Sequence, residues 1–175
     1  MGLFGFGKKK KYLLEWQKVV MTDSPDRLIT TEQQLRQISE QQASNDLRII
    51  ADCTKLLKET INADVFFSRL ELLKETSKHL TLLEPYVNFT GASPSDALKE
   101  VFEHEQIAIC YFIRRYYDYI CDKVGKLKTE KAKQRQYGIF RDTLTAYFDK
   151  MNQDNIQYVQ DTLSKLNIAE TGENI

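Results

Sequence analysis

The sequence predicts an all-α protein, an antiparallel bundle of about four long helices followed by a short C-terminal helix. Glycine and proline are scarce in the 175-residue chain: the three prolines are Pro25, Pro85 and Pro94, and neither residue type occurs from Asp26 to Glu84. Strands need frequent turns, and turns recruit Gly, Pro and Asn, so this spacing favours helices. Apolar residues that recur at three and four positions support the same class.

The first helix is expected from Asp26 to Ile61. A turn-like cluster at 22–26 precedes it and separates a basic segment, residues 1–21, from a bundle domain, residues 22–168. The window Ser39–Asp46 has no large apolar side chain, so it is interpreted either as a loop or as helix that projects into water. Residues 169–175 are expected to be a frayed tail.

Local signals place the ends of the next two helices. Asn62 or Asp64 can cap the second helix, and Pro85 can end it, because a proline ring disfavours the α conformation in the residue before it. The third helix is expected to begin at Ser93-Pro94-Ser95-Asp96, which combines a Ser cap, proline at the first position and an acidic third position.

The third helix contains the longest apolar run of the chain, Ile107–Ile113, and Ile113 is expected at the centre of the core. The same helix carries a broad apolar stripe, which needs more than one neighbour to cover it. The stripe consists of Ile109, Phe112, Ile113, Tyr116, Ile120 and Leu127, with Cys110, Tyr117, Cys121 and Val124 beside it. Downstream, residues 129–136 are polar on every side but consist of good helix formers, so helix is preferred over loop. Asn152 is expected to mark the break before the terminal helix.

Composition limits the functional classes. The apolar run of Ile107–Ile113 is far shorter than the roughly 20 residues that span a bilayer, and no secretory signal is evident, so a cytoplasmic protein is expected. The three cysteines lack metal or disulfide spacing. Only two histidines could act as neutral-pH bases, and no catalytic or cofactor motif is present, so a non-enzymatic protein without a cofactor is expected.

A metal-dependent enzyme is the weakest alternative. Glu75 and His79 are four residues apart, as are Glu100 and His104, so each pair lies on one helical face and the four could ligate a metal ion. Carboxylate-bridged bundle sites use a different spacing, Glu-x-x-His. Hydrogen bonding between Glu and His within each helix is therefore the preferred interpretation.

Nucleic-acid binding is the second alternative, and it depends on the basic segment 123–135. Lys128, Lys131 and Arg135 cluster on one side of a helix, whereas the other basic residues of the segment fall elsewhere. The chain has no net charge and a pI of about 6.7, although nucleic-acid-binding domains are usually basic. A solvated face is therefore preferred over a nucleic-acid site, and nucleic acid is not the expected partner.

Two adjacent arginines, Arg114 and Arg115, interrupt the apolar third helix. Because buried arginines must be paired, we expect a carboxylate partner, either Asp118, Asp122 or one on a neighbouring helix.

The N-terminal segment carries the leading functional hypothesis. Apolar side chains on a glycine-spaced stretch are followed at once by four lysines, which is the order expected when a segment enters an anionic membrane surface. The expected contacts are Leu3, Phe4, Phe6, Lys8, Lys9, Lys10, Lys11 and Trp16. The competing interpretation is a lysine-rich tail followed by a helix that packs on the bundle.

Together these observations predict a non-enzymatic helical interaction or scaffold protein with an unidentified protein partner. It is expected to be held at the inner face of the cell membrane by residues 1–21. Broad apolar helix faces often find cover in a second subunit, so self-association is also expected.

Overall fold

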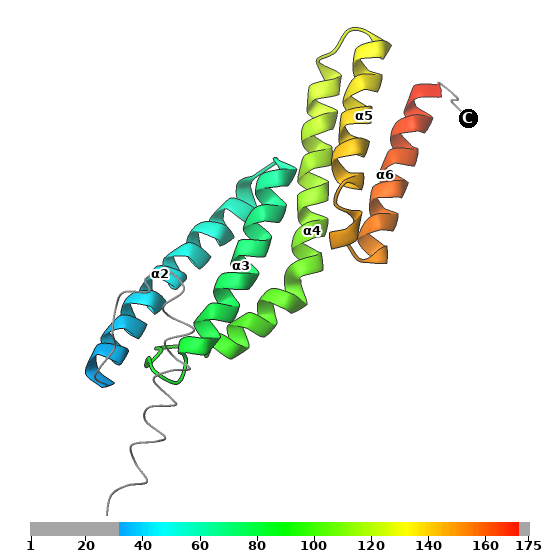
Figure 1. The fold of residues 1–175 in the computed structure, drawn as a ribbon. Helices are drawn as coiled ribbons and strands as arrows, with labels where there is room; N and C mark the ends of the chain where they lie inside the picture. The colour runs from blue at the N-terminus through cyan, green and yellow to red at the C-terminus, as the bar shows by residue number, and fades with distance from the viewer. Residues whose placement is uncertain (1–31, 172–175) are drawn as a thin grey trace, which may run out of the picture. The chain divides into compact units, whose positions relative to one another are not determined.

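The computed structural model describes residues 32–171, and within that range the chain forms five α-helices, one 3₁₀ turn and no strand (Figure 1). The all-α bundle class is confirmed. The helices are α2 (Glu32–Glu59), α3 (Ala63–Leu83), α4 (Pro94–Gly125), α5 (Glu130–Thr145) and α6 (Gln153–Thr171), with the 3₁₀ turn Phe148–Lys150 between α5 and α6.

The described residues divide into two compact units. The first unit comprises residues up to Ile50 together with Glu75–Leu98, and the second comprises Ala51–Lys74 and the chain from Lys99 onward. Helices α2, α3 and α4 each contribute residues to both units.

Side-chain caps begin the helices where the sequence predicts them. The Asn62 Oδ1 atom accepts a hydrogen bond of 3.1 Å from the amide of Val65 at the start of α3. At the start of α4 the Asp96 amide donates to Ser93 Oγ at 3.2 Å, and Ser93 Oγ donates to the Asp96 carboxylate at 3.1 Å. Both predicted caps are confirmed, because each depends only on residues three positions apart.

The expected breaks also hold. Helix α3 ends at Leu83, two residues before Pro85. In the polar window 129–136, the first residue caps a helix and the other residues belong to it. Thr129 precedes α5, and its side chain accepts a hydrogen bond from the Ala132 amide. The preference for helix in this window is therefore confirmed from the first residue of α5 onward.

The other polar window, Ser39–Asp46, is helical, so the loop interpretation is wrong. The helix does not project into water either, because Ser39, Ala43 and Asp46 are only 0%, 2% and 7% exposed. Their spacing of four and three residues places them on one face of α2. This face packs against the rest of the first unit.

The buried residues of this window have short side chains and share the face with an apolar cluster. Leu35 and Ala43 share a buried cluster with Leu80 and Leu83 of α3. The buried polar groups are paired: Ser39 Oγ donates to the Leu35 carbonyl at 2.7 Å. Asp46 Oδ2 lies 2.6 Å from His79 Nδ1. The side chains of Ser39 and Asp46 are therefore buried on this face with their hydrogen bonds satisfied.

Enlarging Ala43 is expected to destabilise the first unit. Ala43→Leu should cost about 1–3 kcal/mol of the free energy of unfolding, because the added atoms meet closely packed neighbours. Urea titration measures the change, and Ser44→Leu on the exposed side of the same turn is the matched control. Equal stability of the two variants would contradict close packing at Ala43.

The core of the second unit is built on aromatic rings. Phe66 and Phe112 stack with centroids 4.3 Å apart, Phe112 and Tyr116 lie 5.9 Å apart, and Tyr116 and Phe140 lie 5.3 Å apart. These rings join α3, α4 and α5. Ile113 is fully buried beside them, so its predicted place in the core is confirmed.

Candidate functional site

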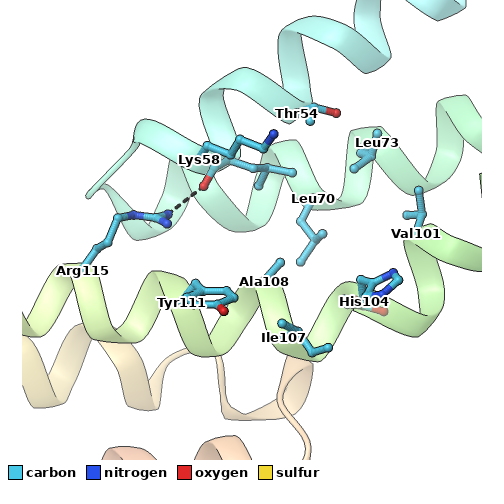
Figure 2. Close-up of a pocket in the computed structure, with 12 residues that line it drawn as sticks. Thr54, Lys58, Leu70, Leu73, Val101, His104, Ile107, Ala108, Tyr111 and Arg115 are labelled. Carbon is cyan, nitrogen blue, oxygen red and sulfur yellow. Dashed lines mark hydrogen bonds between the residues drawn. The ribbon is translucent and has the colours of Figure 1, made fainter.

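The second unit contains an apolar pocket with a volume of about 470 Å³ (Figure 2). It is lined by the C-terminal end of α2, the first half of α3 and the middle of α4. The apolar lining residues are Leu57, Leu70, Leu73, Val101, Ile107 and Ala108. The polar or amphipathic ones are Thr54, Lys58, His104, Glu105, Tyr111 and Arg115.

The floor and the edge of the apolar pocket differ in exposure. Leu57, Leu70 and Leu73 are each no more than 8% exposed and form a fixed floor. On α4, by contrast, Ile107 is 50% exposed and Tyr111 is 60% exposed, and both border the same pocket. Since these two residues are four apart, they project from one face of the helix and leave an apolar strip uncovered within the described chain.

Arg115 is paired differently from the prediction. Its Nη2 atom donates to the main-chain carbonyl of Leu57 at 2.7 Å, which Figure 2 shows as a dashed line reaching the end of α2. The expected carboxylate partner is therefore wrong: Arg115 has no ion pair among residues 32–171. The contact is physically reasonable, because the last carbonyls of a helix lack partners within it and carry partial negative charge. Arg114, the other member of the pair, is exposed.

The Arg115 guanidinium is left with unused hydrogen-bonding capacity. Its Nε atom is buried and has no hydrogen-bond partner in the described part of the chain. Burial lowers the pKa of Arg115 from its ordinary value, which reflects a charge removed from water without a compensating anion. A positive charge of this kind favours a negative group arriving from outside.

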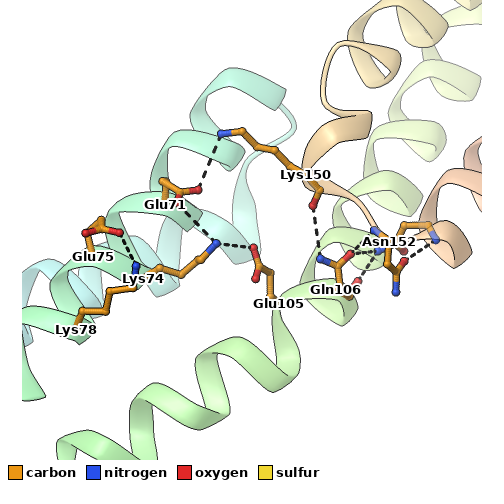
Figure 3. Close-up of polar contacts among 9 residues, drawn as sticks. Glu71, Lys74, Glu75, Lys78, Glu105, Gln106, Lys150 and Asn152 are labelled. Atoms are coloured by element: carbon orange, nitrogen blue, oxygen red, sulfur yellow. Dashed lines mark hydrogen bonds and ion pairs between the residues drawn. The ribbon is translucent and has the colours of Figure 1, made fainter.

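The other charges of the apolar pocket leave it positive on balance. Glu105 is occupied, because its carboxylate binds Lys74 at 2.9 Å, with both side chains about one-sixth exposed or less (Figure 3). Burial alone would lower the pKa of Lys74, but the hydrogen bond and charge of Glu105 outweigh it and raise the pKa. Lys58 has no ion pair among the described residues. Arg115 and Lys58 are therefore the uncompensated charges.

Three of the four side chains in the metal hypothesis make other contacts. Glu75 accepts from Lys78 at 2.8 Å, and His79 binds Asp46. His104 Nδ1 lies 2.9 Å from the main-chain carbonyl of Glu100 rather than its carboxylate. Within residues 32–171 no group of three or more His, Cys, Asp or Glu side chains is arranged to hold a metal ion. His104 lines the apolar pocket, which no sequence pattern indicates.

The basic residues of the nucleic-acid hypothesis are exposed. Lys128 lies in the turn before α5, and Lys131 and Arg135 lie on α5 four residues apart. Neighbouring lysines are neutralised, since Lys126 binds Asp122 and Lys133 binds Glu130. None of Lys128, Lys131 and Arg135 has an ion pair in the part of the chain described.

A polar cluster missed by the sequence reasoning connects α4 to the start of α6. The side-chain oxygen of Gln106 accepts from the Asn152 amide at 2.9 Å and from Asn155 Nδ2 at 2.9 Å (Figure 3). Asn152 in turn caps α6 by accepting from the Asn155 amide. All these groups satisfy one another, so this cluster has a structural role.

The expected membrane contacts from Leu3 to Trp16 lie outside the described residues. Among the helices within 32–171, none is both long and apolar enough to cross a membrane. No protein-family model, curated protein or solved structure matches the chain.

Proposed function

We propose that this chain is a non-enzymatic helical interaction protein that binds an apolar helical segment of a partner protein in the apolar pocket. The observation that carries the proposal is the combination of a buried leucine floor with the half-exposed Ile107 and Tyr111 on its edge. Contiguous apolar surface on a folded protein typically marks an interaction site. Tyrosine and arginine beside such a pocket are characteristic of interface hot spots.

The exposure of Ile107 and Tyr111 favours a macromolecular partner over a small ligand. Small-molecule sites bury 70–90% or more of their ligand, and therefore surround it. Here Ile107 and Tyr111 line the pocket but are 50% and 60% exposed, so the pocket does not surround its occupant. A helix that lays apolar residues at spacings of three, four and seven into the pocket fits this shape.

Selection of peptides from a random library tests the proposal without a known partner. Peptides of about four helical turns are selected on the full-length protein and their affinities measured by fluorescence polarisation. We expect the bound peptides to carry apolar residues with helical spacing. Ile107→Asp should lower the affinity of these peptides at least about tenfold, because it places a charged carboxylate against their apolar residues. Ile139→Asp on α5, where Ile139 is 41% exposed outside the pocket, is the matched control.

Two outcomes would overturn this assignment. If every selected peptide binds the Ile107→Asp and Ile139→Asp variants with equal affinity, the apolar pocket is not a docking site for a helical segment. Concentration-dependent dimerisation in sedimentation velocity that Ile107→Asp abolishes would instead identify a second copy of the chain as the occupant.

We further propose that residues 1–21 hold this interaction protein at an anionic membrane surface on the cytoplasmic side. The support is the sequence order alone: apolar Leu3, Phe4 and Phe6 directly precede the four lysines Lys8–Lys11. Vesicle co-sedimentation tests this attachment independently of the apolar pocket.

A further inference from the structure

We propose that the partner segment carries a carboxylate beside its apolar anchor, and that Arg115 and Lys58 bind it at the end of the apolar pocket. This inference rests on the proposed function, because it specifies the chemistry of the segment that docks there.

Arg115 can offer several hydrogen bonds to such a group. A guanidinium has five N–H donors, and in the described chain only Nη2 is used, toward the Leu57 carbonyl. That contact fixes the guanidinium at the end of α2, and Nη1, which is not among the buried unpaired atoms, makes no hydrogen bond within the described residues. A carboxylate can take two parallel bonds from a guanidinium, an arrangement that is both strong and directional.

The surrounding charges favour an anion and do not compete for Arg115. Glu105, the acidic residue in the lining, is already bound to Lys74 at 2.9 Å. Lys58 adds a second positive charge from the last turn of α2. The lowered pKa of Arg115 agrees with a cation whose desolvation is not compensated within residues 32–171.

The spacing along α4 predicts where the carboxylate lies in the partner. Ile107, Tyr111 and Arg115 follow one another at intervals of four residues, so each lies about one helical turn, roughly 5.4 Å, beyond the last. A helix aligned with α4 that packs apolar residues on Ile107 and Tyr111 reaches Arg115 one turn later. We therefore expect Asp or Glu three or four residues from an apolar anchor in the binding segment.

A double-mutant cycle measures this recognition with peptides whose binding depends on Ile107. Arg115→Gln is combined with replacement of the peptide's acidic residue by its amide. We expect either change alone to weaken binding about tenfold and both together to cost little more, which is the behaviour of two interacting groups. Arg114→Gln, which alters the exposed neighbouring arginine, is the matched control and should leave binding unchanged.

Arg115→Gln also removes the hydrogen bond to the Leu57 carbonyl, so weaker binding could result from a change in folding. Lys58→Gln is a second variant without that drawback. Lys58 has no described partner to lose, and its replacement should weaken the acidic peptide several-fold and the amide peptide hardly at all. Thermal melts of both variants report any loss of structure. If Ile107-dependent peptides show no coupling to Arg115 or Lys58, the carboxylate proposal is wrong while the docking function stands. If no peptide depends on Ile107, the docking function itself fails.

Discussion

Replacing Phe112 by alanine is expected to cost about 3–5 kcal/mol of the free energy of unfolding. Phe112 is fully buried and lies at the centre of the aromatic core of the second unit. Its ring stacks on Phe66 at 4.3 Å and meets Phe67 edge-on at 6.0 Å. Removing it opens a cavity and also forfeits ring pairs worth roughly 0.5–1.5 kcal/mol each beyond their buried area.

Urea titration followed by circular dichroism measures this loss. Tyr111→Ala is the matched control, because it removes the adjacent aromatic ring, which is 60% exposed, from the same helix. We expect the control to change stability by no more than about 0.5 kcal/mol, as is usual for surface positions. A loss below about 1 kcal/mol for Phe112→Ala would show that the ring stack is not the stabilising core.

The sequence predicts the elements of the fold well where a local cause decides them. Asn62 caps α3 and Ser93 caps α4 through residues three positions away. Pro85 ends α3 through its own ring geometry. In each case the interacting residues lie within one helical turn of each other. The sequence alone is therefore enough to predict where these helices begin or end.

Features set by distant residues could not be predicted in this way. The absence of large apolar residues in Ser39–Asp46 indicated exposure, yet Ala43 is buried in a cluster with Leu80 and Leu83 of α3. Arg115 was expected to bind a carboxylate and instead binds the carbonyl of Leu57, 58 positions away in the chain. Neither partner can be identified from periodicity, which reports only that a face is buried or polar.

The apolar pocket could not be predicted, for the same reason. The apolar stripe predicted for α4 contains Ile109, Phe112 and Ile113, which are fully buried. Ile107 and Tyr111 lie outside that stripe and are 50% and 60% exposed. Locating the pocket required Leu57 and Leu70 from two other helices, and no sequence pattern links these positions.

The full-length protein is expected to co-sediment with anionic vesicles at low ionic strength. Lys8, Lys9, Lys10 and Lys11 are each worth about 1 kcal/mol near such a surface. Partial burial of Leu3 and the two phenylalanines adds up to about 1.5–3 kcal/mol for each side chain. The expected attachment therefore combines the charge of the lysines with apolar contact from Leu3, Phe4 and Phe6.

Two variants test whether residues 2–11, and their four lysines in particular, are required for binding to the vesicles. Deletion of residues 2–11 should leave the protein in the supernatant, and so should replacement of Lys8, Lys9, Lys10 and Lys11 together by glutamine. The matched control replaces Lys128, Lys131 and Arg135 by glutamine, since these are exposed basic residues of the described chain. The control should remain with the vesicles.

Changes in salt concentration and vesicle composition test whether residues 1–21 bind the membrane or form a lysine-rich tail that does not bind it. At about 0.5 M salt the Debye length falls well below its value of about 8 Å at physiological ionic strength, so wild-type protein should be released. Neutral vesicles should bind it weakly at any salt concentration, because apolar contacts alone then remain. Release of the Lys128, Lys131 and Arg135 variant would instead indicate a membrane contact at the start of α5 and the segment before it. Failure of wild-type protein to bind anionic vesicles at low salt would exclude membrane attachment through residues 1–21.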